Sequence, residues 1–250
     1  MGNGPLRPGP TRKVIRLRPF RRLLNSPLAL RVAEVLDRRS ENRMTAFGML
    51  AQAFEFVKIN GIGGDYLEFG VWRGTTFHHA RTMARRYRVP GVKFRAFDSF
   101  QGLPPVAANK YEIWREGQFA CGREEFEAEL KRKGFRPGEY VVTEGFYADS
   151  LSDGLVAALK SEGMRAAVTY IDCDLYESTR DVLRFLAHFL QDGTVVCFDD
   201  YWNYRGRSDM GEQRALAEFA AAHPEMHLRP YLAYSPTGMS FLCEFRRAET

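Results

Sequence analysis

Short apolar runs alternate with segments of helical periodicity between residues 66 and 198, and this alternation constrains the fold more than any other feature. Strands that alternate with helices form a parallel sheet with helices on both faces. The fourth run is apolar almost throughout, which is typical of a central parallel strand. We predict five strands here, at residues 66–69, 93–97, 140–143, 166–171 and 194–198.

The last part of the chain predicts a hairpin instead of another crossover. Residues 228–234 and 239–245 are strand-like and are joined by Ser-Pro-Thr-Gly, a turn signal. The expected fold is therefore α/β, with a seven-stranded, mostly parallel sheet that ends in a C-terminal antiparallel hairpin. Residues 102–118 form a connection long enough to be functional. We predict helices at residues 28–36, 45–59, 75–87, 124–133, from Ser178 or Thr179 to about 190, and 212–222.

The first 43 residues are a basic arm that differs in charge from the rest of the chain. They carry eleven Lys/Arg and three Asp/Glu (net +8), whereas residues 44–250 carry 25 basic and 28 acidic residues (net −3). We therefore expect a partly flexible N-terminal arm with one helix at 1–43 and a folded domain at 44–250. Such an arm can meet an anionic membrane or nucleic acid. The alternatives are a solvated extension, a lid or an oligomer contact.

Composition excludes several classes of protein. With 45% apolar and 27% charged residues in 250, the chain can bury a real core. No apolar run approaches the roughly eighteen residues that cross a bilayer, and early prolines interrupt any secretory leader. The four cysteines form no CxxC pair, so neither a disulfide scaffold nor a zinc knuckle is predicted. We expect a cytoplasmic homo-oligomer without stable membrane insertion.

A strand-to-helix turn at residues 66–75 (YLEFGVWRGT) carries the first chemical signal. Glycines at 70 and 74 let the backbone turn sharply and approach a ligand closely. The spacing is not GxGxxG, and the carboxylate of Glu68 would repel a pyrophosphate. It suits instead a ligand that bears an ammonium or sulfonium cation. The alternative is an ordinary tight turn.

Acidic residues also end the second and third predicted strands. Asp98, followed by Ser99, lies 30 positions after Glu68. An acid at this place in a doubly wound sheet accepts hydrogen bonds from ribose hydroxyls, although Asp also favours turns and caps. Glu144 and Gly145 fall where an adenine edge would lie.

Four carboxylates give the strongest signal. Asp172 and Asp174 follow the fourth predicted strand, and Asp199 and Asp200 follow the fifth. Because neighbouring parallel strands bring their carboxyl ends together, the four acids should gather at one rim of the sheet. Two unit charges about 4 Å apart repel by roughly 4 kcal/mol at an effective dielectric near 20, so the cluster needs a cation or shared protons. Oxygen ligands select a hard cation, with Mg²⁺ expected and Ca²⁺ or Mn²⁺ as alternatives.

The alternative explanation for these acids is structural. They would cap the following helices or pair with Arg180 or Arg205, which accounts for one or two acids but not for four at one rim. Tyr201, Trp202 and Tyr204 follow the double Asp directly. They are candidates for an acceptor pocket, and the alternative is that they are ordinary loop residues.

Taken together, these motifs resemble those of the macrocin-type sugar O-methyltransferases of antibiotic biosynthesis, a family of class I S-adenosylmethionine (SAM) methyltransferases. Between residues 60 and 245 they read, in order, YLEFGVWRGTT, FDSFQGLP, EGQFACGREEF, YIDCDLYESTRDVL and CFDDY. The resemblance implies a Rossmann-like class I methyltransferase fold. That fold has seven strands with the last in an antiparallel hairpin, in agreement with the strand pattern.

The resemblance also assigns roles to residues. Asp172, Asp199 and Asp200 would bind Mg²⁺, and Asp174 would be the general base. Cys173 departs from the family, which usually has Gly there, and residues 202–210 do not match the antibiotic enzymes. The cofactor-binding residues, from the methionine end of SAM to its adenine, are expected to be Glu68, Gly70, Trp72, Thr75, Asp98, Ser99, Glu144, Gly145 and Asp172.

The leading hypothesis is an Mg²⁺-dependent transfer of a methyl group from SAM to a hydroxyl of a sugar or glycosylated small molecule, of natural-product or polysaccharide type. A second hypothesis has a catechol-like vicinal diol as acceptor, on which Trp114, Trp202 or Tyr204 would stack. Glu68 and the terminal hairpin disfavour a nicotinamide oxidoreductase. A module that binds nucleic acid or membrane through its basic arm would leave the four acids unexplained, so we expect no nucleic-acid partner.

Overall fold

The computed structural model describes residues 45–105 and 113–246, which include one seven-stranded sheet. The strand order is β3-β2-β1-β4-β5-β7-β6. Strands β1 to β5 pair in parallel, and β7 pairs antiparallel with both β5 and β6. All seven predicted strands and the terminal hairpin are confirmed. The strands are β1 (Asp65–Phe69), β2 (Phe94–Asp98), β3 (Tyr140–Glu144), β4 (Ala166–Ile171), β5 (Val195–Phe198), β6 (Met226–Tyr234) and β7 (Gly238–Phe245).

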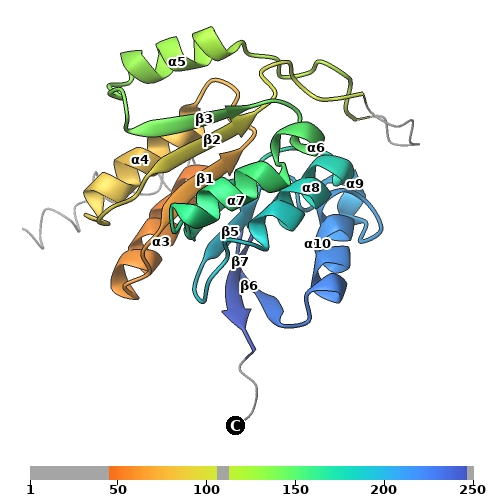
Figure 1. Cartoon of the computed structure of the whole chain (residues 1–250). Coiled ribbons are helices and arrows are strands. Elements are labelled where there is room, and N and C mark those ends of the chain that lie inside the picture. Colours follow the sequence, from red (N-terminus) through yellow and green to blue (C-terminus); the bar gives the residue numbers. More distant parts are fainter. Residues whose placement is uncertain (1–44, 106–112, 247–250) are drawn as a thin grey trace, which may run out of the picture. The chain divides into compact units, whose positions relative to one another are not determined.

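Helices cover both faces of this sheet (Figure 1). One face carries α3, α4 and α5, and the other carries α7, α8 and α10. In the described ranges no helix combines the length and the apolar character that a membrane crossing requires. The predicted helix at 28–36 and the arm at 1–43 lie outside the described residues. The helices are α3 (Ala46–Ile59), α4 (Thr75–Arg86), α5 (Arg123–Arg132), α6 (Tyr147–Ser150), α7 (Asp153–Ser161), α8 (Tyr176–Leu186), α9 (Asn203–Gly206) and α10 (Gly211–Ala222).

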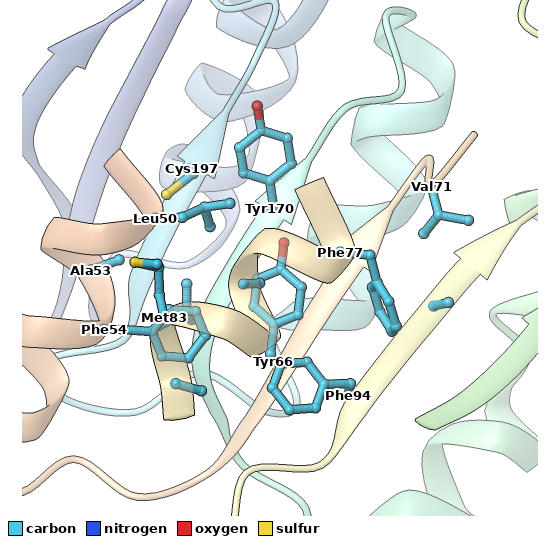
Figure 2. Packing of buried hydrophobic residues seen from close by; sticks show 14 of the residues in the cluster. Leu50, Ala53, Phe54, Tyr66, Val71, Phe77, Met83, Phe94, Tyr170 and Cys197 are labelled. Atoms are coloured by element: carbon cyan, nitrogen blue, oxygen red, sulfur yellow. The ribbon is translucent and has the colours of Figure 1, made fainter. Parts of the chain in front are cut away.

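The two faces of the sheet have separate hydrophobic cores, because successive strand residues point to opposite faces. In β1, Tyr66 packs toward α3 and α4, whereas Leu67 and Phe69 pack toward α7 and α8. The Tyr66 ring lies 5.8 Å from that of Phe54 and 6.0 Å from that of Phe77. Figure 2 shows this core, in which the buried tyrosines Tyr66 of β1 and Tyr170 of β4 lie among aliphatic and aromatic groups.

Four helices differ from the prediction: α8 in its bounds, and α6, α7 and α9 because no helix was predicted there. Helix α8 begins at Tyr176, before the predicted caps, because the Thr179 hydroxyl donates to the Leu175 carbonyl at 2.9 Å inside the helix instead of capping it. Helix α7 was not predicted, since Gly154 in its first turn weakens the helical pattern. Its N-cap is Ser152, whose side chain accepts a hydrogen bond from the Leu155 N–H at 3.3 Å.

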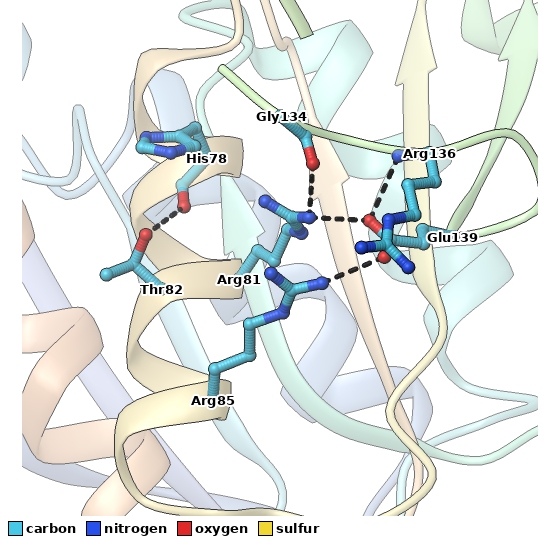
Figure 3. Close-up of polar contacts among 7 residues, drawn as sticks. All are labelled: His78, Arg81, Thr82, Arg85, Gly134, Arg136 and Glu139. Atoms are coloured by element: carbon cyan, nitrogen blue, oxygen red, sulfur yellow. Dashed lines mark hydrogen bonds and ion pairs between the residues drawn. The ribbon is translucent and has the colours of Figure 1, made fainter. Parts of the chain in front are cut away.

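A buried arginine ties α4 to the segment between α5 and β3 (Figure 3). Arg81 is 5% exposed, and its Nη2 donates to a Glu139 carboxylate oxygen at 2.7 Å and to the Gly134 carbonyl at 2.6 Å. Arg85 donates to the other Glu139 oxygen at 2.8 Å. The Arg81 guanidinium also lies 4.3 Å from the Phe135 ring centroid. Glu139 therefore supplies the charge that lets Arg81 be buried here.

Candidate active site

A cavity of about 660 Å³ opens at the carboxyl ends of β1, β2, β4 and β5, the place where doubly wound sheets bind ligands. Its size is typical of a small-molecule site. Nine of the predicted site residues line it: Gly70, Trp72, Asp98, Ser99, Gly145, Asp172, Asp174, Asp199 and Asp200.

The turn after β1 can approach the turn after β4 only because residue 70 is glycine. Gly70 has φ +85°, and a Cβ there would lie 1.8 Å from the Asp172 carbonyl oxygen. Trp72, two residues on, also has a positive φ of 40°, which costs energy for a non-glycine residue. Its indole is 47% exposed at the cavity. The strained turn thus presents backbone and one aromatic side chain to the cavity.

Glu68 and Thr75 do not line the cavity. The Glu68 carboxylate is fully buried beneath it and accepts hydrogen bonds from the Tyr66 hydroxyl and from the Thr76 hydroxyl, the latter at 2.5 Å. Burial raises the pKa of Glu68 to about 8, although these hydrogen bonds oppose the shift. Thr75 is the first residue of α4. Their assignment to the cofactor stays a prediction.

Asp98 lines the cavity and anchors two loops at once. Its Oδ2 accepts hydrogen bonds from the Val71 N–H at 2.7 Å and the Trp72 N–H at 3.3 Å, and its Oδ1 accepts from the Phe100 N–H at 2.7 Å. Burial nevertheless raises the pKa of Asp98. The Ser99 hydroxyl donates to the Gly102 carbonyl at 2.8 Å and so shapes the start of the long connection.

After β3 the structure separates the two predicted residues. Gly145 lines the cavity, whereas Glu144 lies outside its lining and pairs with Arg123 at 3.1 Å. Phe146 and Tyr147 line the cavity beside Gly145, and no motif in the sequence pointed to them. Their position depends on the short helix α6, which follows β3 directly.

The predicted acid cluster is present at the opposite side of the cavity. One carboxylate oxygen from each of Asp172, Asp174 and Asp200 lies within 4.8 Å of the others. Asp199 joins them at the rim, where the Tyr170 hydroxyl donates to its Oδ1 at 2.5 Å. Asp174 has a positive φ of 61°. Neighbouring strand ends therefore bring the four acids to one cavity as expected, but the close group of oxygens contains Asp174 and not the predicted ligand Asp199.

Burial raises the pKa of all four carboxyl groups, to about 6 for Asp174. Repulsion among the acids raises the pKa of Asp172 and Asp200 further. A metal-free cluster therefore retains protons near neutral pH. Grouped oxygen donors of this kind fit a hard divalent cation, whose charge would remove the need for those protons.

The structural alternative finds no support at Arg180 or at the start of α8. Arg180 pairs with Asp181 at 2.9 Å and not with one of the four, and α8 has no side-chain hydrogen bond at its N-cap, Leu175. Cys173 is buried with its Sγ 3.6 Å from the Thr179 hydroxyl oxygen, and the carboxylates on either side of it still reach the cluster.

Sequence reasoning missed a fifth carboxyl group beneath the cluster. Glu212, in the first turn of α10, is 1% exposed, and its Oε2 accepts a hydrogen bond from the Asp200 N–H at 3.1 Å. Burial and the neighbouring acids raise its pKa well above the usual value. An acid in the first turn of a helix is common, so the sequence carried no signal that this one is buried.

The predicted acceptor residues, Tyr201, Trp202 and Tyr204, do not line the cavity, but Tyr204 lies close to it, since burial and the charges of Asp174 and Asp200 raise its pKa to about 12. Tyr201 packs against Phe198 and Phe241. The assignment of the three residues to the acceptor stays a prediction. The apolar wall comes instead from residues 103–105 and from Trp114 and Phe119, at either end of the long connection. Residues 106–112 of that connection lie outside the described residues.

Comparisons with known proteins come from both sequence and structure. A model of the macrocin-O-methyltransferase (TylF) family matches residues 40–224. The chain is 32% identical over 174 residues to the 8-demethyl-8-(2,3-dimethoxy-alpha-L-rhamnosyl)-tetracenomycin-C 4'-O-methyltransferase of Streptomyces olivaceus, covering 63% of this chain and 64% of that protein. It is 28% identical over 181 residues to the demethyldecarbamoylnovobiocin O-methyltransferase of Streptomyces niveus, covering 66% of each. The chain thus spans just under two thirds of the length of these curated relatives.

Two solved structures share the fold. The O-methyltransferase NovP matches with a TM-score of 0.63 and 25% identity over 78% of each chain. The calicheamicin methyltransferase CalS11 matches with a TM-score of 0.62 and 23% identity over 90% of each chain.

Proposed function

The chain belongs to the macrocin-O-methyltransferase (TylF) family, and on that premise we propose that it transfers a methyl group from SAM to a hydroxyl of a sugar or glycosylated small molecule, with Mg²⁺ at the acid cluster. One observation carries the proposal: a single cavity joins the β1 and β2 loops, with Gly70 and Asp98, to the acids that follow β4 and β5. A relative whose name specifies a rhamnosyl-bearing substrate supports a sugar acceptor.

Residues on the β1 to β3 side would hold the cofactor. SAM, when bound, supplies a methyl group already activated on a sulfonium, so the protein must place the acceptor oxygen in line with it. Gly70 gives the backbone its close approach. Asp98 is held by three backbone N–H groups, two on Oδ2 and one on Oδ1, so one lone pair of Oδ1 is left for a ribose hydroxyl. Gly145, Phe146 and Tyr147 form the neighbouring wall.

Residues on the β4 and β5 side would handle the proton. Asp172, Asp199 and Asp200 would hold Mg²⁺, which when bound lowers the pKa of a chelated hydroxyl. Asp174 is the proposed general base: burial raises its pKa in the metal-free cluster, and the charge of a bound cation would oppose that shift and keep the carboxylate ionised to accept a proton. Leu103 and Trp114 line the mouth and help to exclude water.

The test of this assignment is Asp174→Asn. We expect turnover to fall by about 10²- to 10⁴-fold, while binding of S-adenosylhomocysteine and Mn²⁺ is retained. Glu218→Gln, at an exposed acid bonded to Tyr176 and Arg214, is the control and should keep full activity. An active Asp174→Asn enzyme would remove Asp174 as the base. Loss of Mn²⁺ binding would make it a ligand instead, a role that its distance from Asp172 and Asp200 permits.

One observation favours the catechol-like acceptor. Trp114 lines the cavity and lies 6.0 Å, centroid to centroid, from Phe119, whose ring is 6.3 Å from that of Trp72. Such a wall can stack on an aromatic ring. An acceptor screen of neutral glycosides against catechols separates the two proposals, since methylation of catechols alone would reject the sugar acceptor. The cytoplasmic location, the homo-oligomer and the role of the arm stay predictions.

A further inference from the structure

Tyr170 connects the hydrophobic core to the acid cluster. It lies on β4, is 1% exposed, and pairs in register with Cys197 of β5. Its hydroxyl reaches past the end of β5 and donates to Asp199 Oδ1 at 2.5 Å. In Figure 2 the Tyr170 ring stands beside Cys197 and Leu50, with its hydroxyl pointing out of the apolar cluster. The hydroxyl, the only polar group of the Tyr170 side chain, therefore donates its hydrogen bond to the Asp199 carboxylate.

The hydrogen bond from Tyr170 holds Oδ1 of Asp199 and leaves Oδ2 available to a ligand. The Asp199 N–H donates to the Ile171 carbonyl at 2.9 Å, so both the backbone and the side chain of Asp199 are held from β4. The neighbouring Asp200 is held from other elements, by the Asn203 side chain at 2.6 Å and by Glu212 at 3.1 Å. Tyr170 is thus the side-chain partner that orients Asp199.

A phenol is suited to this task because it is neutral. An arginine or lysine at the same place would neutralise Asp199 and compete with a cation, whereas a hydroxyl orients the carboxylate and leaves its charge in place. We propose that Tyr170 is a positioning residue, whose hydroxyl holds Asp199 in the orientation in which it binds the divalent cation. This inference rests on the proposed function, which places a cation at these acids.

The chain offers a matched control for the hydroxyl. Tyr234 belongs to the same core cluster, is also 1% exposed, and has its ring centroid 6.4 Å from that of Tyr170. Its hydroxyl has no hydrogen-bond partner among the residues that the structure describes. Tyr170→Phe and Tyr234→Phe therefore each remove one buried oxygen from the same core, and only the first removes a contact to an acid.

The test measures Mn²⁺ binding to the full, metal-stripped chain through the electron paramagnetic resonance signal of the free ion. We expect Tyr170→Phe to weaken Mn²⁺ binding by about 10- to 100-fold, as loss of a partner that orients a ligand does. Tyr234→Phe should stay within about twofold of the wild type. Neither variant should change the affinity for S-adenosylhomocysteine measured without metal. An unchanged affinity in Tyr170→Phe, or an equal loss in both variants, overturns the inference.

The same substitution in an Asp199→Asn variant distinguishes an effect through Asp199 from a general loosening of the core by Tyr170→Phe. With Asp199→Asn already present, Tyr170→Phe should cause no further loss of Mn²⁺ affinity, because its effect acts through Asp199. A further loss of the same size would show that Tyr170 acts independently of Asp199 and would overturn the inference. Absence of Mn²⁺ binding in the wild type is a different result: it rejects the metal part of the proposed function, and the inference with it.

Discussion

Replacing Glu68 with glutamine should change how the stability of the protein depends on pH. The Glu68 carboxyl is fully buried between the Tyr66 and Thr76 hydroxyls, and burial raises its pKa from 4.5 to about 8. The folded protein therefore keeps a proton that the unfolded chain loses above pH 4.5. Because the folded state binds the extra proton, this group stabilises the fold most at low pH, and the contribution is lost as the pH rises toward 8.

The size of the effect follows from the shift. Between pH 5 and 8 the folded state keeps the Glu68 proton and the unfolded state has lost it. Over these roughly three pH units, each unit lowers the free energy of unfolding by about 1.36 kcal/mol. The free energy of unfolding should thus fall by about 4 kcal/mol from this group alone. A chain of this size loses roughly 2 to 4 °C of Tm per kcal/mol, so Tm should fall by on the order of 10 °C. Glutamine keeps the shape, bonds the same hydroxyls and does not titrate.

The assay is thermal unfolding of the wild type and Glu68→Gln from pH 5 to 8, without ligand and with EDTA. The two proteins should have similar Tm values at pH 5. As the pH rises, the Tm of the wild type should fall below that of the variant, and the difference should be on the order of 10 °C at pH 8. Parallel Tm curves would refute the reasoning. Binding of S-adenosylhomocysteine to the variant at pH 5 separately tests whether Glu68 contacts the cofactor.

Further predictions concern the turn after β1, the α4 anchor and the acid cluster. Gly70→Ala, at φ +85°, should lower the free energy of unfolding in urea by at least about 2 kcal/mol, because its Cβ meets a backbone carbonyl; an unchanged midpoint would contradict the geometry. Glu139→Ala leaves the buried Arg81 guanidinium without its charge and should cost about 3 kcal/mol in the same assay, whereas a cost under 1 kcal/mol would show that Arg81 finds another partner. The double variant Asp199→Asn, Asp200→Asn should lose the rise in Tm that Mg²⁺ gives the wild type, and a retained rise would place the cation elsewhere.

The fold could be predicted from the sequence because its signals are local. Strands β1 to β5 are short, largely apolar runs, and the Ser-Pro-Thr-Gly turn at residues 235–238 marks the hairpin between β6 and β7. The gathering of the acids was equally predictable, since parallel order alone brings the ends of β4 and β5 together. Helix α7 was missed where a first-turn glycine hid a helical pattern that its packing stabilises.

What could not be predicted depends on contacts between residues distant in the sequence. The bonds of Tyr170 to Asp199 and of Glu212 to Asp200 join residues 29 and 12 positions apart, and nothing in the local pattern distinguishes these side chains from core or surface residues. Tyr204 was expected to line the cavity and is not among the lining residues, although it lies near Asp174 and Asp200. Its left-handed conformation, φ 54°, turns the chain after β5 in a way that no turn signal marked.

The most direct test of the central claim is thermal unfolding of the full chain with S-adenosylhomocysteine, with NAD as the comparison ligand. At a hundred times its dissociation constant a ligand that binds only the folded state adds about 2.7 kcal/mol, which for this chain is a rise in Tm of roughly 5 to 10 °C. We expect that rise with S-adenosylhomocysteine and none with NAD. A protein that NAD stabilises and S-adenosylhomocysteine does not would contradict the assignment of the cavity to SAM.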